Sequence, residues 1–177
     1  MAATFTWQRS HGAGETISTA TEINWKNIDD DTTAYTSAPI TKGNNSFELW
    51  LAGKFSGTFT QIMGGLFAHT ATAFGTGLTL KGIPLMNGGG DADRVTYTTP
   101  STTANTKLTK DMTTAIAIAS GVNVWFGPTG ANNTGKKPFM TTNPCWTNYL
   151  TTQLQTTASA GTGDTATVTL TLSYDET

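Results

Sequence analysis

The 177-residue sequence contains few charged residues. Only 12% of its residues are Asp, Glu, Lys or Arg, about half of the roughly 25% that is typical of soluble proteins. The formal net charge is −2, and Lys136-Lys137 is the only pair of adjacent basic residues. Non-specific binding of nucleic acids depends on clustered cations that displace counterions from phosphates. We therefore expect neither DNA nor RNA as a direct partner.

Long apolar runs and paired cysteines are also missing. No run approaches the ~20 apolar residues that a membrane-spanning helix needs, so we expect no membrane partner. The N-terminus lacks the basic segment followed by an apolar run that is typical of a secretory signal. Cys145 is the single cysteine and, without a second one in the chain, predicts a small buried side chain rather than a disulfide. These features predict synthesis in a cytoplasm and a fold that needs no disulfides.

Side chains suited to metal binding or catalysis are sparse. Neither His11 nor His69 has a companion ligand at zinc-site spacing. The run Asp29-Asp30-Asp31 offers oxygen ligands, but it lacks the spacing of a calcium loop, so we expect a solvated turn. Ser10-His11 is the only adjacent nucleophile–base pair, and a catalytic triad is recognised by geometry rather than by order. We therefore predict no cofactor and no metal, and we rank an enzyme last among the possible functions.

The residue types that are abundant favour β-structure. The chain contains 39 threonines and 19 glycines. Threonine is β-branched, suits a pleated strand and keeps a surface polar without charge. The clearest pattern lies in the stretch 40–57, where turn residues at 42–46 precede an alternation from Ser46 to Ser56. This period of two predicts a strand with one buried face. Trp50 falls on the opposite face, where it either packs in a second layer of the domain or contacts another subunit, since Trp is favoured at interface hot spots.

Further strands are predicted along the rest of the chain. They are expected at 4–9, 22–28, 59–68, 77–83, 94–98, 113–119, 122–126, 145–155 and 166–174. The stretch 113–119 also fits one helical turn, and 127–139 is a long loop that is either a binding loop or disordered. Short strands separated by turns predict an all-β fold, an antiparallel β-sandwich or a jelly-roll-like domain. The residues predicted to be buried are Phe47, Leu49, Leu51, Phe55, Val168, Leu170 and Leu172.

The first 21 residues are small, polar and glycine-bearing. We expect residues 1–21 to form an N-terminal arm or extended segment and residues 22–177 to form a single β-sandwich domain. Phe5 and Trp7 could anchor such an arm on a neighbouring subunit. The alternative is a monomer with a frayed N-terminus.

Two stretches resemble structural proteins of tailed bacteriophages. The stretch PITKGNNSFELWLAGKFSGTFTQI (39–62) resembles a "PI-x-x-G-x-NS" run that leads into a "K-(F/V)-x-G-x-F" strand in those proteins. The stretch YLTTQLQTTASAGTGDTATVTLTLSYDET (149–177) resembles their ending, with an ASAG segment, a Thr-rich strand and a terminal YDE. Together the two stretches cover about a third of the chain.

The resemblance implies a virion structural protein, and specifically a decoration (cement) protein on the outer surface of a phage capsid. Such a protein stabilises the shell by binding only its assembled form. The implied location is the virion after synthesis in the host cytoplasm, and the implied partners are the major capsid protein or another virion protein and further copies of this chain, as a trimer. The candidate partner-binding residues are Phe5, Trp7, Trp50, Lys136 and Lys137. The alternatives are a tail, baseplate or head-fibre protein, or a carbohydrate-binding β-sandwich module that stacks sugars on its tryptophans.

Overall fold

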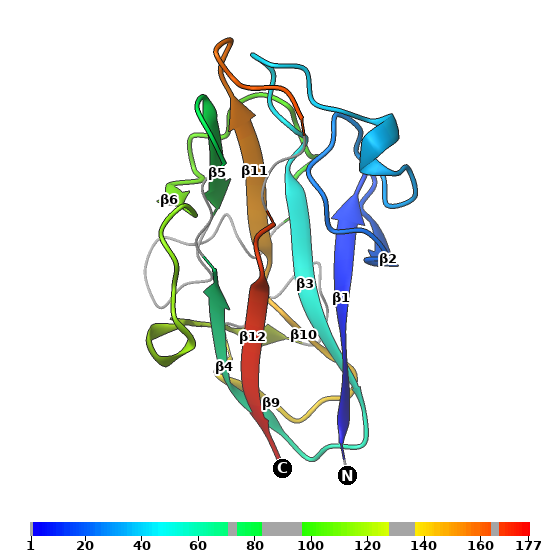
Figure 1. Cartoon of the computed structure of the whole chain (residues 1–177). Coiled ribbons are helices and arrows are strands. Elements are labelled where there is room, and N and C mark those ends of the chain that lie inside the picture. Colours follow the sequence, from blue (N-terminus) through cyan, green and yellow to red (C-terminus); the bar gives the residue numbers. More distant parts are fainter. Residues whose placement is uncertain (1, 71–73, 83–96, 128–136, 164–166) are drawn as a thin grey trace.

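The computed structural model describes residues 2–70, 74–82, 97–127, 137–163 and 167–177. Lys136, most of the predicted strand at 94–98 and most of the predicted loop at 127–139 lie outside these ranges. The regular secondary structure of the described residues is almost entirely β-strand, arranged as two antiparallel sheets (Figure 1). The predicted all-β, sandwich-like class is therefore confirmed. None of the described residues form a helix long and apolar enough to cross a bilayer.

The larger sheet, sheet A, runs in the order β2-β1-β3-β11-β5-β6, and β10 pairs with both β3 and β8. Its strands are β1 (Ala3–His11), β2 (Thr16–Thr19), β3 (Leu49–Gly57), β5 (Leu78–Gly82), β6 (Lys110–Asp111), β8 (Phe126–Gly127), β10 (Cys145–Thr147) and β11 (Leu150–Thr156). The smaller sheet, sheet B, runs in the order β12-β4-β7, and β9 also pairs with β4. Its strands are β4 (Ile62–His69), β7 (Val122–Asn123), β9 (Phe139–Met140) and β12 (Leu170–Glu176). Two short 3₁₀ helices, η1 (Tyr35–Ser37) and η3 (Ile118–Ser120), complete the described elements.

The N-terminal residues belong to sheet A of the same chain. Strand β1 pairs with β3 from Ala3↔Gly57 to Ser10↔Trp50, and β2 pairs with the end of β1. The backbone of residues 3–19 is thus extended, as expected, but its hydrogen bonds are made inside the domain. The expectation of an arm separate from a domain that begins at residue 22 has to be corrected accordingly, since a strand paired on both sides is an integral part of the sheet.

The main core lies between the two sheets. Leu49, Leu51 and Phe55 of β3 are buried there as predicted, together with Ile62 and Phe67 of β4. The other residues predicted to be buried are only half-buried; they are Phe47, Val168, Leu170 and Leu172. The last two lie on β12, the edge strand of the narrow sheet B, and an edge strand has no neighbour to cover its outer side.

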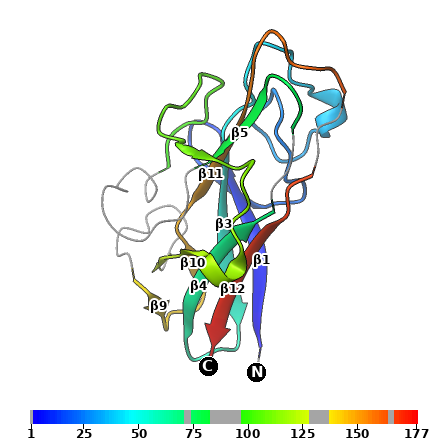
Figure 2. The ribbon, with the colours of Figure 1, turned by 60° about the vertical axis from the view of Figure 1, so that its left-hand side comes forward.

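Sheet B covers only part of sheet A. The segment 20–48, blue to cyan at the upper end in Figures 1 and 2, covers the adjoining part of the core face. Ile23 and Trp25 pack from this segment against the main core, and Trp25 and Ile40 also pack on a second cluster around Leu80 and Leu154. The end of the sandwich is therefore closed by irregular chain rather than by strands.

Several predicted strands have different boundaries or are absent. Residues 22–28 are not a strand: the indole Nε1 of Trp25 donates to Thr152 Oγ1 at 3.0 Å, but the segment joins no ladder. Strand β3 begins only at Leu49, and in 113–119 an isolated bridge at Ile116 is followed by η3. The alternation in 22–28 reflects burial of one side of the segment. Such one-sided burial does not require the segment to pair with a neighbouring strand.

Candidate functional site

Trp50 lies in an aromatic cluster on the outer face of sheet A. Its side chain is 2% exposed. The ring centroid of Trp50 lies 5.2 Å from that of Tyr149 and 5.4 Å from that of Tyr97, in both cases near-perpendicular. Of the two interpretations from sequence, the structure thus shows packing in a second layer of the same chain. A side chain this buried offers no surface to another subunit.

Hydrogen bonds tie the β1–β2 turn to this cluster. The Tyr149 hydroxyl donates to the Glu15 carboxylate and accepts from Ser10 Oγ at 3.1 Å. The Tyr97 hydroxyl donates to the Gly12 carbonyl at 2.7 Å. Burial raises the pKa of both tyrosines, so their hydroxyls keep their protons and remain donors. Glu15 has a φ of 53°, a left-handed conformation that is uncommon for a residue with a side chain. The turn is thereby held against the sheet.

The same face is covered by the connection that includes residues 97–108. Gln153 is fully buried. Its amide nitrogen donates to three backbone carbonyls, those of Ser46 (3.1 Å), Ser101 (3.1 Å) and Thr103 (3.0 Å). Glu48 accepts from the Trp50 indole Nε1 at 3.3 Å. Buried polar side chains thus fix the connection on sheet A, because an unpaired buried polar group is costly.

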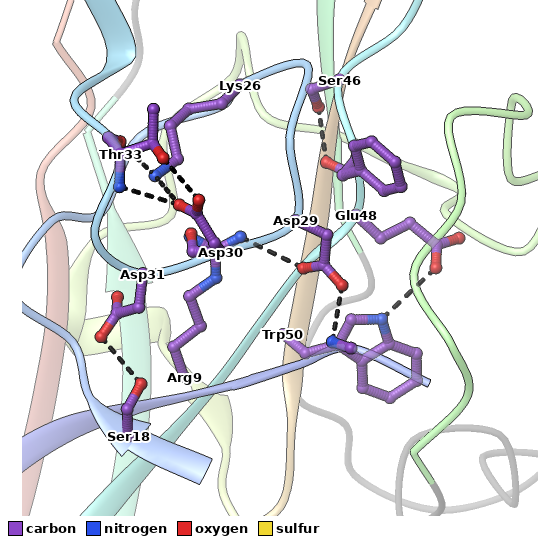
Figure 3. A network of polar contacts seen from close by, with 12 residues as sticks. Arg9, Ser18, Lys26, Asp29, Asp30, Asp31, Thr33, Ser46, Glu48 and Trp50 are labelled. Atoms are coloured by element: carbon purple, nitrogen blue, oxygen red, sulfur yellow. Dashed lines mark hydrogen bonds and ion pairs between the residues drawn. The ribbon is translucent and has the colours of Figure 1, made fainter. Parts of the chain in front are cut away.

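On the core side of β1, Arg9 anchors the aspartate run. Arg9 is 2% exposed, and its Nη2 lies 3.3 Å from Asp29 Oδ1, while its Nη1 donates to the Asp30 carbonyl. The other oxygen of Asp29 accepts from the Gly12 N–H at 2.7 Å. Figure 3 shows the guanidinium of Arg9 directed toward this run. A buried guanidinium requires a nearby carboxylate, and Asp29 supplies it.

Lys26 forms a second buried charge centre beside the first. Its Nζ lies 3.2 Å from Asp30 Oδ1 and 3.6 Å from Glu22 Oε2, and it donates to the Thr33 carbonyl at 2.6 Å. Burial alone would raise the pKa of Asp30, but hydrogen bonds from the Thr33 hydroxyl and amide and from Lys26 hold it well below its usual range. Asp30 is therefore ionised at neutral pH, and it organises the turn.

The third aspartate is the most buried of the run. Asp31 is 6% exposed, and its Oδ2 accepts from Ser18 Oγ of β2 at 2.7 Å. The prediction of a solvated turn at 29–31 was therefore wrong: Asp29 and Asp31 contact β1, β2 and the turn between them, and Asp30 contacts Lys26 and Thr33 of its own segment. A sequence signal was present, since Arg9 follows Phe5 and Trp7 at two-residue spacing and so falls on their core-facing side. Within the described ranges, no group of three or more His, Cys, Asp or Glu residues could hold a metal ion.

The adjacent residues Ser10 and His11 do not contact each other as a nucleophile and base would. Ser10 and His11 are consecutive on β1, so their side chains leave opposite faces of the strand, and Ser10 bonds to Tyr149 instead. His69 is buried on β4, where its Nδ1 donates to the Thr70 carbonyl at 2.9 Å. It borders a small apolar hollow lined also by Phe67, Gly82, Lys110, Met112, Ile116 and Leu150. Cys145 is buried as predicted, and burial raises the pKa of its thiol to about 11.

The remaining candidate partner residues lie in different places. Phe5 and Trp7 are half-buried and pack on the main core, with 5.3 Å between the rings of Phe5 and Phe55. Lys137 is exposed, and its backbone bridges to Phe126. The structure thus does not bring the candidates Phe5, Trp7, Trp50 and Lys137 together into one surface.

Comparison with known proteins adds no relative: no family model, curated protein or solved structure matches this chain.

Proposed function

We propose that the protein is a structural component of a tailed-phage virion, namely a decoration protein bound to the outer surface of the capsid. The proposal is carried by the spatial relation of the two stretches that resemble phage proteins. Strand β3 of the first stretch pairs with β11 of the second, from Leu150↔Leu51 to Thr152↔Leu49. Two stretches that are far apart in the sequence thus form the middle of one sheet, as expected if a shared pattern specifies a shared core.

Further contacts join the same two stretches. The Ser46 N–H donates to the Leu154 carbonyl at 2.9 Å, and the Gly43 N–H donates to Thr156 Oγ1 at 2.8 Å. Strand β12, also from the second stretch, crosses to sheet B and returns over the first. There the ring of Tyr174 lies 4.7 Å from that of Phe55. The two stretches that carry the resemblance therefore contribute strands to both sheets of the sandwich.

The carbohydrate-binding alternative receives less support from the tryptophans. Paired exposed aromatics on one rim would favour it. All five tryptophans lie in the described residues, and none is more than half-exposed; they are Trp7, Trp25, Trp50, Trp125 and Trp146. Trp146 is already covered by Lys54, whose Nζ lies 5.4 Å from the ring centroid. A decoration protein, by contrast, needs a rigid surface and no reactive group, because it acts by binding the assembled shell.

The test is binding to capsids of the phage that encodes the protein. Shells prepared without the protein, tails prepared from the same phage and empty buffer would each be sedimented with purified protein. Saturable co-sedimentation with the shells, and a higher melting temperature of the decorated shells, is the expected result. Binding to tails but not to shells would replace the proposal with a tail or baseplate role, and binding to neither would refute it.

A further inference from the structure

Strand β12 has a free edge along its length. Its one neighbour among the described strands is β4. The Thr70 N–H donates to the Thr169 carbonyl at 3.1 Å, and beyond the other end of β12 the Thr177 N–H donates to the Gln61 carbonyl at 3.0 Å. Because successive residues of a strand direct their backbone groups to alternate sides, the odd-numbered residues face β4. The backbone N–H and C=O groups that point away from β4 therefore belong to Leu170, Leu172, Tyr174 and Glu176.

The core-facing side chains along this edge are incompletely covered. Five of them are only half-buried, namely Leu170, Leu172 and Tyr174 of β12 and Phe5 and Trp7 of β1. The ring centroid of Phe5 lies 6.4 Å from that of Tyr174 and 5.2 Å from that of Trp7. In Figures 1 and 2, β1 lies on the side of β12 away from β4. Sheet B thus ends at β12, and no described strand covers β1 beyond it.

The edge lacks the features with which proteins usually prevent further pairing. Exposed edge strands are commonly protected by proline, by charged side chains or by a bulge. Residues 170–174 include neither proline nor a charged residue. The register irregularity beyond Ser173 adds a residue to β4 and not to β12. The free backbone groups and the half-buried side chains are thus available together to a further strand.

The C-terminal end of the edge is acidic. Asp175 is exposed and Glu176 is half-buried. The Glu176 carboxylate accepts the Ala3 N–H of β1 at 2.8 Å, so it extends from sheet B to sheet A. Neither carboxylate forms an ion pair with a residue in the described ranges. A basic residue of an added strand would therefore form a favourable cross-strand pair at this end.

We propose that this edge binds an extended segment of another polypeptide, which adds as a strand antiparallel to β12. The free backbone groups recognise the extended form of the segment, and the half-buried side chains select apolar residues at alternate positions, over Phe5 and Trp7. The acidic end selects a basic residue at the start of the segment, opposite Glu176. Antiparallel pairing is favoured because it is slightly more stable per residue than parallel pairing. The site does not depend on the virion role, so the failure of either proposal leaves the other unaffected.

The length of the edge sets the length of the segment. Strand β12 has seven residues and spans about 24 Å, so a segment of about seven residues fills it. Strand addition gains its affinity from main-chain hydrogen bonds and its specificity from the alternate side chains. It therefore does not require the area of a standard protein–protein interface.

A matched set of peptides tests the site. The acetylated and amidated peptide KTVTVTV places its lysine opposite Glu176 and its valines on the side of Phe5 and Trp7. It should bind the full-length protein saturably in a calorimetric titration. N-methylation of the first two valines should weaken binding by at least about tenfold, because their N–H groups donate to β12. N-methylation of the last two threonines, whose N–H groups point away from β12, should leave the affinity nearly unchanged.

A charge substitution tests the acidic end. Glu176→Gln keeps an oxygen that can accept the Ala3 N–H but removes the charge. It should weaken binding of KTVTVTV by about two- to fivefold and should not affect binding of STVTVTV, in which serine replaces the lysine. Thr41→Lys makes the same change in net charge at an exposed position outside β12 and should have no effect.

Amide hydrogen exchange measured by NMR locates the added strand. Binding of KTVTVTV should protect the N–H groups of Leu170, Leu172 and Tyr174, whereas the N–H of Thr171 is already protected by β4. Protection at Phe5 instead would place the strand on β1. Protection that grows with protein concentration in the absence of peptide would assign the edge to a second copy. Either result, no binding, or equal losses for the two N-methylated peptides would overturn the proposal.

Discussion

Arg9 and Asp29 form an ion pair of 3.3 Å between β1 and the segment that closes the upper end of the sandwich. Their side chains are 2% and 11% exposed, so both charges are largely removed from water. Asp29 also accepts the Gly12 N–H at the β1–β2 turn, and that turn is held from its other side by Tyr97. A single carboxylate thus connects the core face of the sheet to the turn, and its removal has a predictable cost.

Asp29→Ala should destabilise the protein by about 3–5 kcal/mol, because it leaves the Arg9 guanidinium buried without its counter-charge. Equilibrium unfolding in urea, monitored by tryptophan fluorescence, measures the change. Asp175→Ala is the matched control: this carboxylate is exposed, and its loss should change the free energy of unfolding of the monomer by less than about 0.5 kcal/mol. Equal losses in the two variants would contradict the structural role of the Arg9–Asp29 pair.

Leu51→Ala should cost about 2–5 kcal/mol, since Leu51 is fully buried between the sheets and its truncation leaves a cavity. Leu170→Ala should cost less, about 1–2 kcal/mol, because Leu170 is half-buried on an edge strand and surrounding chain can relax around it. Denaturant midpoints of the two variants provide the comparison. A larger loss for Leu170 than for Leu51 would contradict this assignment of the core.

The strands could be predicted where local alternation coincides with pairing. Strands β1, β5 and β12 overlap the predicted ranges, because their apolar residues recur every second position and face the core. Strand β4 also overlaps its predicted range, although the irregularity at Gly64 interrupts its alternation. Residues 22–28 show the same period but join no strand ladder, since alternation reports one-sided burial and not the presence of a neighbouring strand. The prediction of an arm at residues 1–21 failed for a related reason. Nothing in the small, polar turn after His11 indicates that β1 pairs with a strand some 40 residues later.

The candidate site depended still more on long-range contacts. Alternation assigned Trp50 correctly to the face opposite the core but could not indicate what covers it. The covering residues come from segments far along the chain, and Gln153 holds them through carbonyls at 101 and 103. The role of Asp29, Asp30 and Asp31 could likewise not be predicted from the sequence. Whether a carboxylate is solvated or buried depends on whether the fold places a cation such as Arg9 or Lys26 beside it. Arg9 lies on β1, far from the run in sequence, and nothing in the sequence shows that Lys26, three residues before Asp29, turns its ammonium back to Asp30.

Gly53→Ala should destabilise the protein by about 1–3 kcal/mol through overpacking. An added Cβ would lie 2.6 Å from Phe5 Cε2 and 3.2 Å from Leu172 Cδ2, so the rings and side chains of both layers would have to move. Gly161→Ala is the control, because its Cβ would meet nothing within 4 Å and its φ is not positive. Thermal melting of the two variants measures the difference, and an unchanged melting temperature for Gly53→Ala would show that β1 and β12 do not pack so closely on β3.

Stability should fall as the pH drops below about 6.5, the pKa of an unperturbed histidine, because His69 is buried in a neutral form. Burial lowers the pKa of His69 in the folded protein, and the nearby Lys110 charge lowers it further, whereas the hydrogen bond to the Thr70 carbonyl acts in the opposite direction. A group whose pKa is lower in the folded than in the unfolded state takes up its proton more readily on unfolding. The stability contributed by neutral His69 is therefore fully present above the pKa of His69 in the unfolded state. It is lost progressively as the pH decreases toward the pKa of His69 in the folded state.

Measuring the free energy of unfolding between pH 8 and pH 5 should reveal this pH dependence in the wild type. The variant His69→Gln, which can donate a hydrogen bond but does not titrate, should reduce the pH dependence. An identical pH dependence in the two proteins would mean that His69 does not contribute to the acid sensitivity of the fold.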